Sequence, residues 1–323
     1  MLEIRTLTAD RGDAGQRLDL VLRRHLTDVR AATRTRVQRW ITEGLVTING
    51  ARITRSAART VPGDIVRITV PEAHQPRPVT AEPMPLVVVY EDGDLMVVDK
   101  PAGVVVHPTY RNYERTIMNG LLWHAREWSG AKRPSLVGRL DKMTSGLMLV
   151  AKSAAIHRSM QQAGHAGAID KDYLAIVYGR LAQPMSIELP IAGDPRDRRR
   201  FITAAAGAPS LTRVSPLTSS TLGGIDISLL RCRLVTGRTH QIRVHLSASD
   251  LPIVGDSVYG RLPGHPVDTE TAASLLGTFG RQALHAWRLS FPHPVSGERI
   301  SLEAAIPADM QRLIDSVGLA PPQ

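Results

Sequence analysis

The sequence predicts an α+β protein, with a small α+β module at the N-terminus and a larger domain built on a mixed, mainly antiparallel sheet. Three observations predict this class. Short strand-like runs lie far apart along the chain, helical runs are few, and neither a regular strand–helix alternation nor a glycine-rich phosphate loop is present. A length of 323 residues fits about two domains.

The N-terminal module is expected to span residues 1–70. Residues 15–26 and 33–44 carry apolar side chains at helical spacing, and the second of these runs ends at a glycine. Two strands joined by an Asn-Gly turn follow, and then a further strand after a Pro-Gly-Asp turn. Residues 71–85 contain five prolines and predict a stiff linker, which sets the boundary of the module.

The larger domain is expected to cover residues 86–310 and to be followed by a C-terminal tail, 311–323. Its strands are predicted from apolar or alternating runs bounded by turn residues, at 86–100 (a hairpin), 145–153, 172–181, 225–234 and 239–247. Helical spacing occurs only near 114–126 and 153–166, and a polar loop lies near 260–280.

The charge balance predicts a polyanionic partner. The net charge is +10, and 35 of the 40 basic residues are arginine, whose planar fork matches phosphate groups. Codon usage could account for the excess of arginine over lysine, but not for the net charge. Residues 1–70 hold 13 Arg and 7 acidic residues, which gives +6. Aromatic residues make up only 4%, so a broad base-stacking surface is not expected.

Several classes of protein are excluded by residue usage. The single Cys232 cannot form an internal disulfide or a cysteine-rich metal site, and we expect a buried, inert thiol. His107, His240, His245 and His285 do not show a compact ligand spacing, so no metal site is predicted. Since no long apolar run or leader-like segment is present, we expect a soluble, cytoplasmic protein.

Basic residues cluster on the two predicted N-terminal helices and predict a cationic ridge that contacts a phosphate backbone. They are Arg17, Arg34, Arg36 and Arg39. A solvated helix face is the alternative. The order of elements in residues 15–70 resembles the small RNA-binding module of the alpha-L type, which occurs in a small-subunit ribosomal protein and in RNA-modifying enzymes.

The central segment 137–153, VGRLDKMTSGLMLVAKS, places Asp141 between Arg139 and Lys142, just before a turn and an apolar strand. Neighbouring cations would keep this carboxylate ionised, ready to act as a nucleophile or an electrostatic stabiliser. A surface salt bridge is the alternative. The segment resembles the catalytic motif of RNA pseudouridine synthases of the RluA type, and further blocks occur in that family's order at 88–109, 171–179, 236–260 and 281–298.

This resemblance implies a pseudouridine-synthase fold with a central cleft, and the isomerisation of uridine to pseudouridine in RNA. The reaction moves the ribose C1′ bond from uracil N1 to C5, so it needs no cofactor or metal. Asp141 would act at the anomeric carbon. Tyr173 would lie against the uracil and assist loss of the C5 proton, and Arg243 would pair with Asp141. Without the resemblance, Tyr173 would be a core residue and Arg243 a strand charge.

The target uridine must leave its stack to reach such a site, and Arg139 is our candidate for filling the vacancy. Arginines in the run DPRDRRRF are expected to track phosphate, with a solvated loop as the alternative; they are Arg198, Arg199 and Arg200. We expect a monomer acting on large-subunit ribosomal RNA. Transfer RNA is an alternative substrate, and a catalytically silent RNA-binding or ribosome-assembly factor is an alternative function.

The motif departs from the family pattern at two positions. Gly138 stands where such enzymes commonly carry histidine, and Met143 stands where an acidic residue or proline is often found. Because Asp141 itself is present, we expect activity, but these changes could alter how the loop meets RNA or which RNA is chosen.

Overall fold

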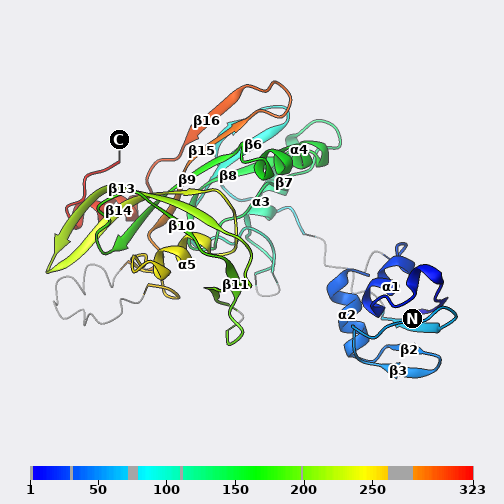
Figure 1. The fold of residues 1–323 in the computed structure, drawn as a ribbon. Coiled ribbons are helices and arrows are strands. Elements are labelled where there is room, and N and C mark those ends of the chain that lie inside the picture. Colours follow the sequence, from blue (N-terminus) through cyan, green and yellow to red (C-terminus); the bar gives the residue numbers. More distant parts are fainter. Residues whose placement is uncertain are drawn as a thin grey trace. The chain divides into compact units, whose positions relative to one another are not determined.

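The computed structural model describes residues 3–29, 32–71, 79–109, 112–197, 199–260 and 279–322. The chain divides into two compact units, Met1–Pro78 and Val79–Gln323 (Figure 1). Residues 72–78 of the proline-rich segment predicted as a linker, and residues 261–278 of the polar loop near 260–280, lie outside the described residues.

The first unit is a four-stranded antiparallel sheet with two short helices, in the strand order β1-β4-β2-β3. Its elements are β1 Glu3–Thr8, η1 Arg11–Asp13, α1 Leu18–His25, α2 Arg34–Thr42, β2 Val46–Ile48, β3 Ala51–Ile53 and β4 Ile65–Val70. The predicted helices, the Asn-Gly hairpin and the last strand are confirmed, whereas β1 was not predicted. The apolar faces of both helices pack into one core, which includes Leu18, Leu22, Val37 and Ile41.

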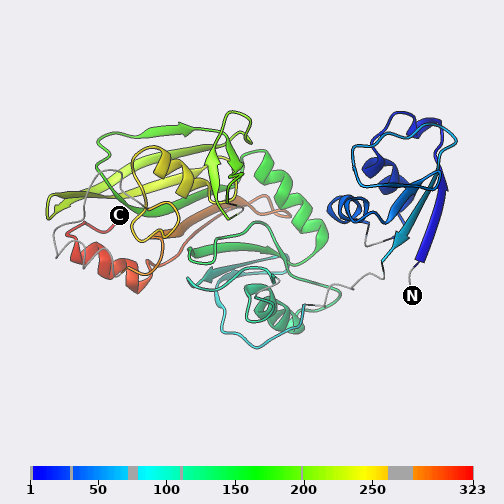
Figure 2. The same ribbon diagram turned by 90° about the horizontal axis from the view of Figure 1, so that it is seen from below.

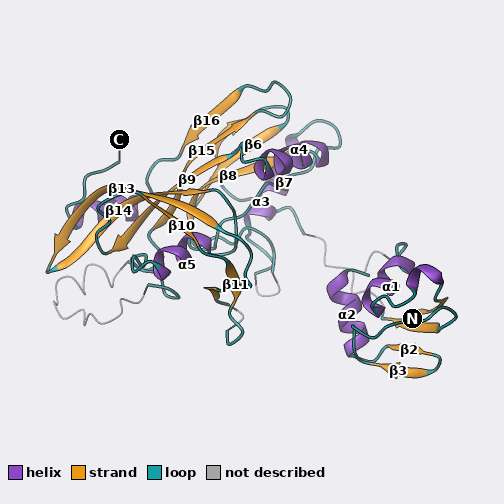
Figure 3. Cartoon of the chain, viewed as in Figure 1, coloured by secondary structure: helices purple, strands orange, loops and turns teal. Residues whose placement is uncertain are grey.

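The second unit is dominated by strands (Figure 3). Its elements before residue 180 are β5 Val87–Glu91, β6 Leu95–Lys100, α3 Ile117–His124, η2 Ala125–Glu127, β7 Ser135–Leu136, β8 Ser145–Ala151, α4 Ala154–His165 and β9 Asp170–Tyr178. The later ones are β10 Met185–Glu188, β11 Ile191–Gly193, β12 Phe201–Thr203, β13 Leu211–Leu222, β14 Ile225–Leu234, α5 Gln241–Ala248, β15 Leu284–Pro292, β16 Arg299–Glu303 and α7 Ala308–Ser316.

One ten-stranded sheet forms the frame of this unit. Its main path runs β10-β13-β14-β9-β15-β8-β6-β5, with β16 paired to β15 and β7 to β8. Among the described strands of this sheet, only the β15–β8 pair is parallel, so the predicted mixed, mainly antiparallel sheet is confirmed. The separate hairpin β11–β12 lies outside this sheet. Strands from both halves of the sequence meet at its centre, where β15 lies between β9 and β8.

The helices α4 and α7 lie at opposite ends of this unit (Figure 2). The largest core cluster joins β9 and β14 to apolar side chains of α7 and the residues after it, among them Leu313, Ile314, Val317 and Leu319. The C-terminal segment expected as a tail therefore contributes to the core, and the boundary predicted at residue 310 falls inside α7.

One predicted strand is wrong. Residues 239–247 were expected to form a strand, because Ile242, Val244 and Leu246 alternate with polar residues. The structure has the helix α5 instead. All residues from Gln241 to Leu246 are buried, polar and apolar alike, so the alternation does not separate an inner face from an outer one.

Candidate active site

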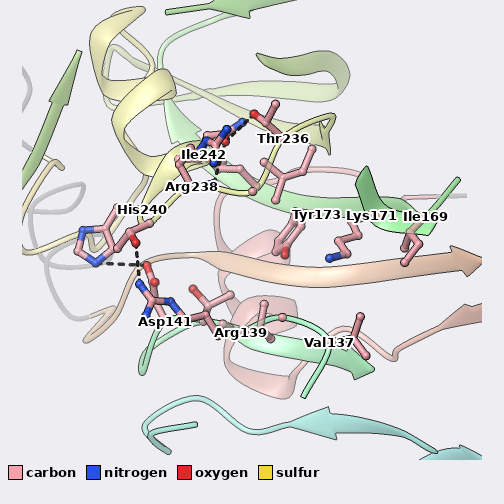
Figure 4. A pocket seen from close by; sticks show the side chains of 18 of the residues that line it. Val137, Arg139, Asp141, Ile169, Lys171, Tyr173, Thr236, Arg238, His240 and Ile242 are labelled. Atoms are coloured by element: carbon pink, nitrogen blue, oxygen red, sulfur yellow. Dashed lines mark hydrogen bonds and ion pairs between the residues drawn. The ribbon is translucent and has the colours of Figure 1, made fainter. Parts of the chain in front are cut away.

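A pocket of about 600 Å³ opens in the second unit between the loop before β8, strand β9 and the N-terminus of α5. It is lined by Asp141, Tyr173 and Arg243, the three residues predicted to carry the chemistry. Figure 4 shows Asp141 and Tyr173 facing this space, with Arg139 and Lys171 beside them. The fold therefore brings together three residues that are up to 102 positions apart in the chain.

Asp141 lies in the loop between β7 and β8, and side chains from other strands hold that loop. The turn closes on itself, since Thr144 N donates to the Asp141 carbonyl at 3.1 Å. Lys100 Nζ donates to the Lys142 carbonyl at 3.1 Å, and Arg281 Nη1 donates to the Met143 carbonyl at 3.3 Å. The loop is fixed through its backbone, so its side chains are left for other contacts.

Lys100, at the end of β6, is fully buried. Its ammonium donates to three carbonyls, those of Pro101, Val104 and Lys142, at 2.8 to 3.1 Å. Burial, together with the charge of Arg281, lowers the pKa of Lys100 to about 7. The sequence alone does not reveal Lys100 as part of the site, because Lys100 acts on the backbone of the Asp141 loop, 42 positions away.

The glycine that opens β8 permits the parallel contact between β8 and β15. Gly146 pairs with Ala286 and has φ +113°. A Cβ at this position would lie 2.2 Å from the Ala286 carbonyl oxygen and 2.6 Å from its nitrogen. No larger residue fits unless β8 or β15 moves. A movement of β8 would reach Asp141, because β8 begins at the end of the loop that holds this residue.

Tyr173 projects from the middle of β9 and is almost fully buried. Burial raises the pKa of the Tyr173 hydroxyl well above its ordinary value, and the negative charge of Asp141 raises it further. The phenol is therefore neutral at physiological pH. Its ring borders the pocket, so it offers an aromatic face and a neutral hydroxyl to whatever enters.

Arg243, on α5, is the buried cation of the site. Its Nη1 donates to Asp141 Oδ2 at 2.8 Å, and its Nε and Nη2 donate to the two oxygens of Asp256 at 2.6 and 2.8 Å. Burial alone would lower the pKa of Arg243, but the hydrogen bonds and charges of Asp256 and Asp141 outweigh it and raise the pKa. The guanidinium is a permanent charge that binds one carboxylate by a fork and the other by a single bond.

Asp256 was not predicted as a site residue. Its side chain is fully buried and also accepts the backbone N–H groups of Val258 and Tyr259, at 2.9 and 3.1 Å. The hydrogen bonds and charge of Arg243 outweigh the effect of burial and lower the pKa of Asp256. The available signal was an aspartate between Gly255 and Ser257, which predicts a carboxylate bonded to its own turn.

The departure at Gly138 leaves open space next to the pocket. A Cβ there would meet only the ammonium of Lys171, at 3.5 Å. Lys171 lies two positions before Tyr173 on β9, so both side chains extend from the same face of the strand. Desolvation lowers the pKa of Lys171. The departure at Met143 changes only the side chain, since the loop is held there by the Met143 carbonyl.

The predicted RNA-contacting residues of the second unit lie at the surface. Arg139 is exposed at the pocket and donates to Thr239 Oγ1 at 2.6 Å. Arg199 is exposed and forms a fork with Asp197, and Arg200 lies 5.7 Å from the centre of the Tyr259 ring. Arg198 lies outside the described residues.

The four predicted arginines of the first unit differ in their surroundings. Arg17 pairs with the buried Asp19 at 2.9 Å, so part of its role is structural. Arg39 is exposed and pairs with Glu43 one helical turn later. Arg34 is exposed and Arg36 half-buried on the same helix, whose other face packs into the core. The helix α2 thus carries Arg34 and Arg39 at its exposed surface, whereas Arg36 is partly covered.

The histidines and the cysteine have separate environments. His245 is buried between Thr212 Oγ1 and the Leu189 carbonyl, and His285 bonds Ser145 Oγ at 2.9 Å. His107 and His240 line the pocket. Cys232 is fully buried as predicted, and burial raises the pKa of its thiol.

Two groups in the described part of the chain gather three residues of metal-ligating type: Asp10, Asp13 and His25, and Asp92, Asp94 and His293. In the first, Arg24 already binds both carboxylates. In the second, His293 Nδ1 accepts a backbone N–H at 3.1 Å, which places the ring proton on Nε2 and leaves no free lone pair for a metal. Both groups are explained by their protein partners.

Across the described residues, no helix has the length and apolar character that crossing a membrane requires.

Comparison with known proteins agrees with this geometry. Residues 94–248 match the family model described as RNA pseudouridylate synthase. A ribosomal large subunit pseudouridine synthase D from Neisseria meningitidis is 40% identical over 307 residues, covering 95% of this chain and 80% of the relative. The uncharacterized RNA pseudouridine synthase YlyB of Bacillus subtilis is 37% identical, covering 96% of this chain and 97% of the relative.

The structure of human RNA Pseudouridylate Synthase Domain Containing 4 is similar to this chain, with 25% identity and a TM-score of 0.59, covering 73% of this chain and 95% of that one. Because its motifs, its sheet and nearly its whole length match these proteins, this chain belongs to the RluA-type family of RNA pseudouridine synthases.

Proposed function

We propose that this protein converts specific uridines of large-subunit ribosomal RNA to pseudouridine, with Asp141 as the residue that acts on the ribose. The observation that carries the proposal is the Asp141 carboxylate, bound at 2.8 Å by a buried arginine at the wall of a pocket of about 600 Å³. The ribosomal substrate is supported by relatives named large subunit pseudouridine synthase D, such as the one from Yersinia pestis, which is 35% identical over 96% of this chain.

Asp141 is suited to react at an electron-poor anomeric carbon. Among the described residues, its hydrogen-bonded partner is Arg243, which binds Oδ2, so Oδ1 remains for the substrate. As the bond between C1′ and uracil N1 breaks, positive charge develops on the ribose, and an ionised carboxylate stabilises it. Asp141 then either adds to C1′ or removes a ribose proton. In the first route the bond between Asp141 and C1′ breaks as C5 joins C1′, and in the second Asp141 returns the ribose proton as that bond forms. In both routes the C5 proton leaves and N1 gains a proton, so the reaction is balanced.

Tyr173 is proposed to support the uracil during this exchange. Its ring can stack on the base, and its neutral hydroxyl can accept the C5 proton only as it passes its own proton on. The raised pKa of Tyr173 therefore favours a proton relay over a tyrosinate base.

RNA is proposed to reach the pocket along basic surfaces of both units. The N-terminal helix α2 supplies Arg34, Arg36 and Arg39, and the β11–β12 hairpin supplies Arg199 and Arg200. Arg139, exposed at the pocket, would occupy the gap left by the flipped uridine. We also propose that the protein acts as a monomer in the cytoplasm.

The test is pseudouridine formation on RNA transcripts. The reaction is measured by the release of tritium from C5-labelled uridine. The wild-type protein should modify a large-subunit ribosomal transcript faster than transfer RNA. Asp141→Asn should abolish release while RNA affinity stays within a few-fold, whereas Asp315→Asn, an exposed position on α7, should behave as wild type. Turnover by Asp141→Asn would refute the assigned role. Modification of transfer RNA alone would replace the substrate, and binding without turnover by the wild-type protein would favour an RNA-binding factor.

A further inference from the structure

His240 stands directly before α5, one helical turn ahead of Arg243. Its backbone is left-handed, with φ 57° and ψ 19°, a conformation in which histidine, asparagine and aspartate are enriched. This places its ring against the site, with Nε2 3.7 Å from Asp141 Oδ2. That separation exceeds a hydrogen bond, and a movement of roughly 1 Å would close it.

The contacts of the other ring nitrogen of His240 favour one tautomer. Nδ1 lies 2.9 Å from the Tyr259 hydroxyl, and the backbone N–H of Phe201 donates to that same hydroxyl at 2.8 Å. Because the hydroxyl oxygen already accepts from Phe201, its own proton is free to go to Nδ1. The ring proton of neutral His240 then stands on Nε2, the atom that faces Asp141.

Tyr259 is in turn held from two sides. Its backbone N–H donates to Asp256 Oδ1 at 3.1 Å, and the same oxygen accepts from Arg243. Its ring packs in a small apolar cluster with Ile191 of β11 and Val244 of α5. Tyr259 therefore connects the β11–β12 hairpin to His240 and, through Asp256, to Arg243.

The hairpin itself contacts His240 as well as Tyr259. Phe201, the first residue of β12, meets the His240 ring edge-on with centroids 5.5 Å apart. Arg200, the residue before it, has its guanidinium 5.7 Å from the centre of the Tyr259 ring. The contacts that fix the orientation of the His240 ring thus begin at the arginine-rich segment proposed to contact RNA.

We propose that His240 is a positioning residue for Asp141, and that the β11–β12 hairpin, acting through Tyr259, couples RNA contact to the orientation of this carboxylate. The inference rests on the proposed function, since it assumes that Asp141 acts on the ribose. An Nε2–H directed at Oδ2 would reinforce the Arg243 bond to the same oxygen and leave Oδ1 for the substrate.

The coupling has a titratable component. The charged and titratable groups facing His240 are Asp141, Arg243, Asp256, Arg139 and, through its hydroxyl, Tyr259. Burial lowers the pKa of His240 below its ordinary value, so the ring is neutral at pH 7. Acid adds a proton at Nδ1, which then donates to the Tyr259 hydroxyl where it had accepted, and it adds a positive charge beside Asp141. The link from Tyr259 to His240 should therefore change as pH falls through the lowered pKa.

Two variants of the full-length protein test separately the two contacts of the His240 ring, Nε2 with Asp141 and Nδ1 with Tyr259. His240→Asn tolerates the left-handed backbone and places an amide near Tyr259, but is too short to reach Asp141. Tyr259→Phe keeps the ring and removes the hydroxyl. Each should lower the single-turnover rate on the RNA transcript about tenfold, and the double variant should also be about tenfold slower, not a hundredfold, because both act through one contact.

Tyr178→Phe is the matched control, since Tyr178 is a buried tyrosine of β9 in the main core cluster. It should keep the wild-type rate. A second readout is the pH profile: the acid limb of the wild-type rate should include an ionisation that is absent in His240→Asn. The inference is overturned if Tyr259→Phe equals Tyr178→Phe in rate, if the two effects multiply, or if the acid limb is unchanged. Activity of Asp141→Asn would instead overturn the proposed function.

Discussion

Replacing Asp256 by asparagine tests whether the buried charges hold the site together. Asp256→Asn preserves shape but removes the negative charge. It also replaces one carboxylate oxygen with an NH₂ group, which faces an N–H donor of Arg243 because both oxygens accept from that side chain. Arg243 would keep Asp141 as its only ionised partner in the contacts described above.

The expected loss can be worked out from these contacts. Removing one partner of a buried ion pair costs about 3–5 kcal/mol when the remaining charge is unpaired. Because Arg243 retains Asp141, we expect the lower part of this range, about 3 kcal/mol. For a unit of this size, 1 kcal/mol corresponds to roughly 2–4 °C in Tm, so Tm should fall by roughly 6–12 °C. The single-turnover rate should fall at least about tenfold, since Arg243 no longer has a fixed position beside Asp141.

Calorimetry and tritium release on the same preparations measure both quantities. Asp172→Asn is the matched control: Asp172 is also a buried aspartate bound by an arginine fork, with Arg233 at 2.8 and 2.9 Å, but Arg233 is more exposed than Arg243. It should cost less stability and leave the rate unchanged. If Asp256→Asn matched this control in both Tm and rate, the account of the site as a charge network would be refuted.

Three further predictions concern the frame, the acid stability and the RNA surface. Gly146→Ala should destabilise the protein by roughly 3 kcal/mol through backbone overlap and a disfavoured φ, whereas Gly93→Ala, with open space around it, should be nearly neutral in thermal unfolding. Burial lowers the pKa of His285 to about 4, so the contribution of the neutral ring to the free energy of unfolding is complete above about pH 6.5. This contribution falls by roughly 3 kcal/mol as pH drops to 4, and the free energy of unfolding of His285→Asn, measured with denaturant, should depend less on pH. Replacing the α2 arginines by glutamine, at Arg34, Arg36 and Arg39 together, should reduce the slope of log affinity for RNA against log salt concentration by about 2. An unchanged slope would mean that this helix does not contact phosphate.

Much of the fold followed from local patterns. The helices α1 and α2 have one apolar face each, and the Asn-Gly turn sets the β2–β3 hairpin. Local patterns failed where a segment is buried on every side: α5 looks like a strand because its residues face protein all round. The central strand β15 was also missed, because its parallel contact with β8 depends on Gly146, which lies 140 positions before its partner Ala286.

The site was predictable in part, for a different reason. Asp141, Tyr173 and Arg243 were expected from the motif resemblance, and the structure brings them to one pocket. The residues that hold them were not expected. Lys100 acts on backbone carbonyls, and Asp256 acts through an arginine on another element, so neither role leaves a pattern in neighbouring residues.

The order of strands in the large sheet has a consequence for how the protein is made on the ribosome. All four strands of the first unit lie within residues 3–70, so this unit can fold as soon as it emerges. The second unit cannot, because β15, Leu284–Pro292, must enter between β8 and β9 from the last part of the chain. A nascent chain would therefore expose the surface of the first unit that we propose to bind RNA well before the pocket exists. Chains that stop short of β15 should bind RNA without modifying it and could compete with finished molecules.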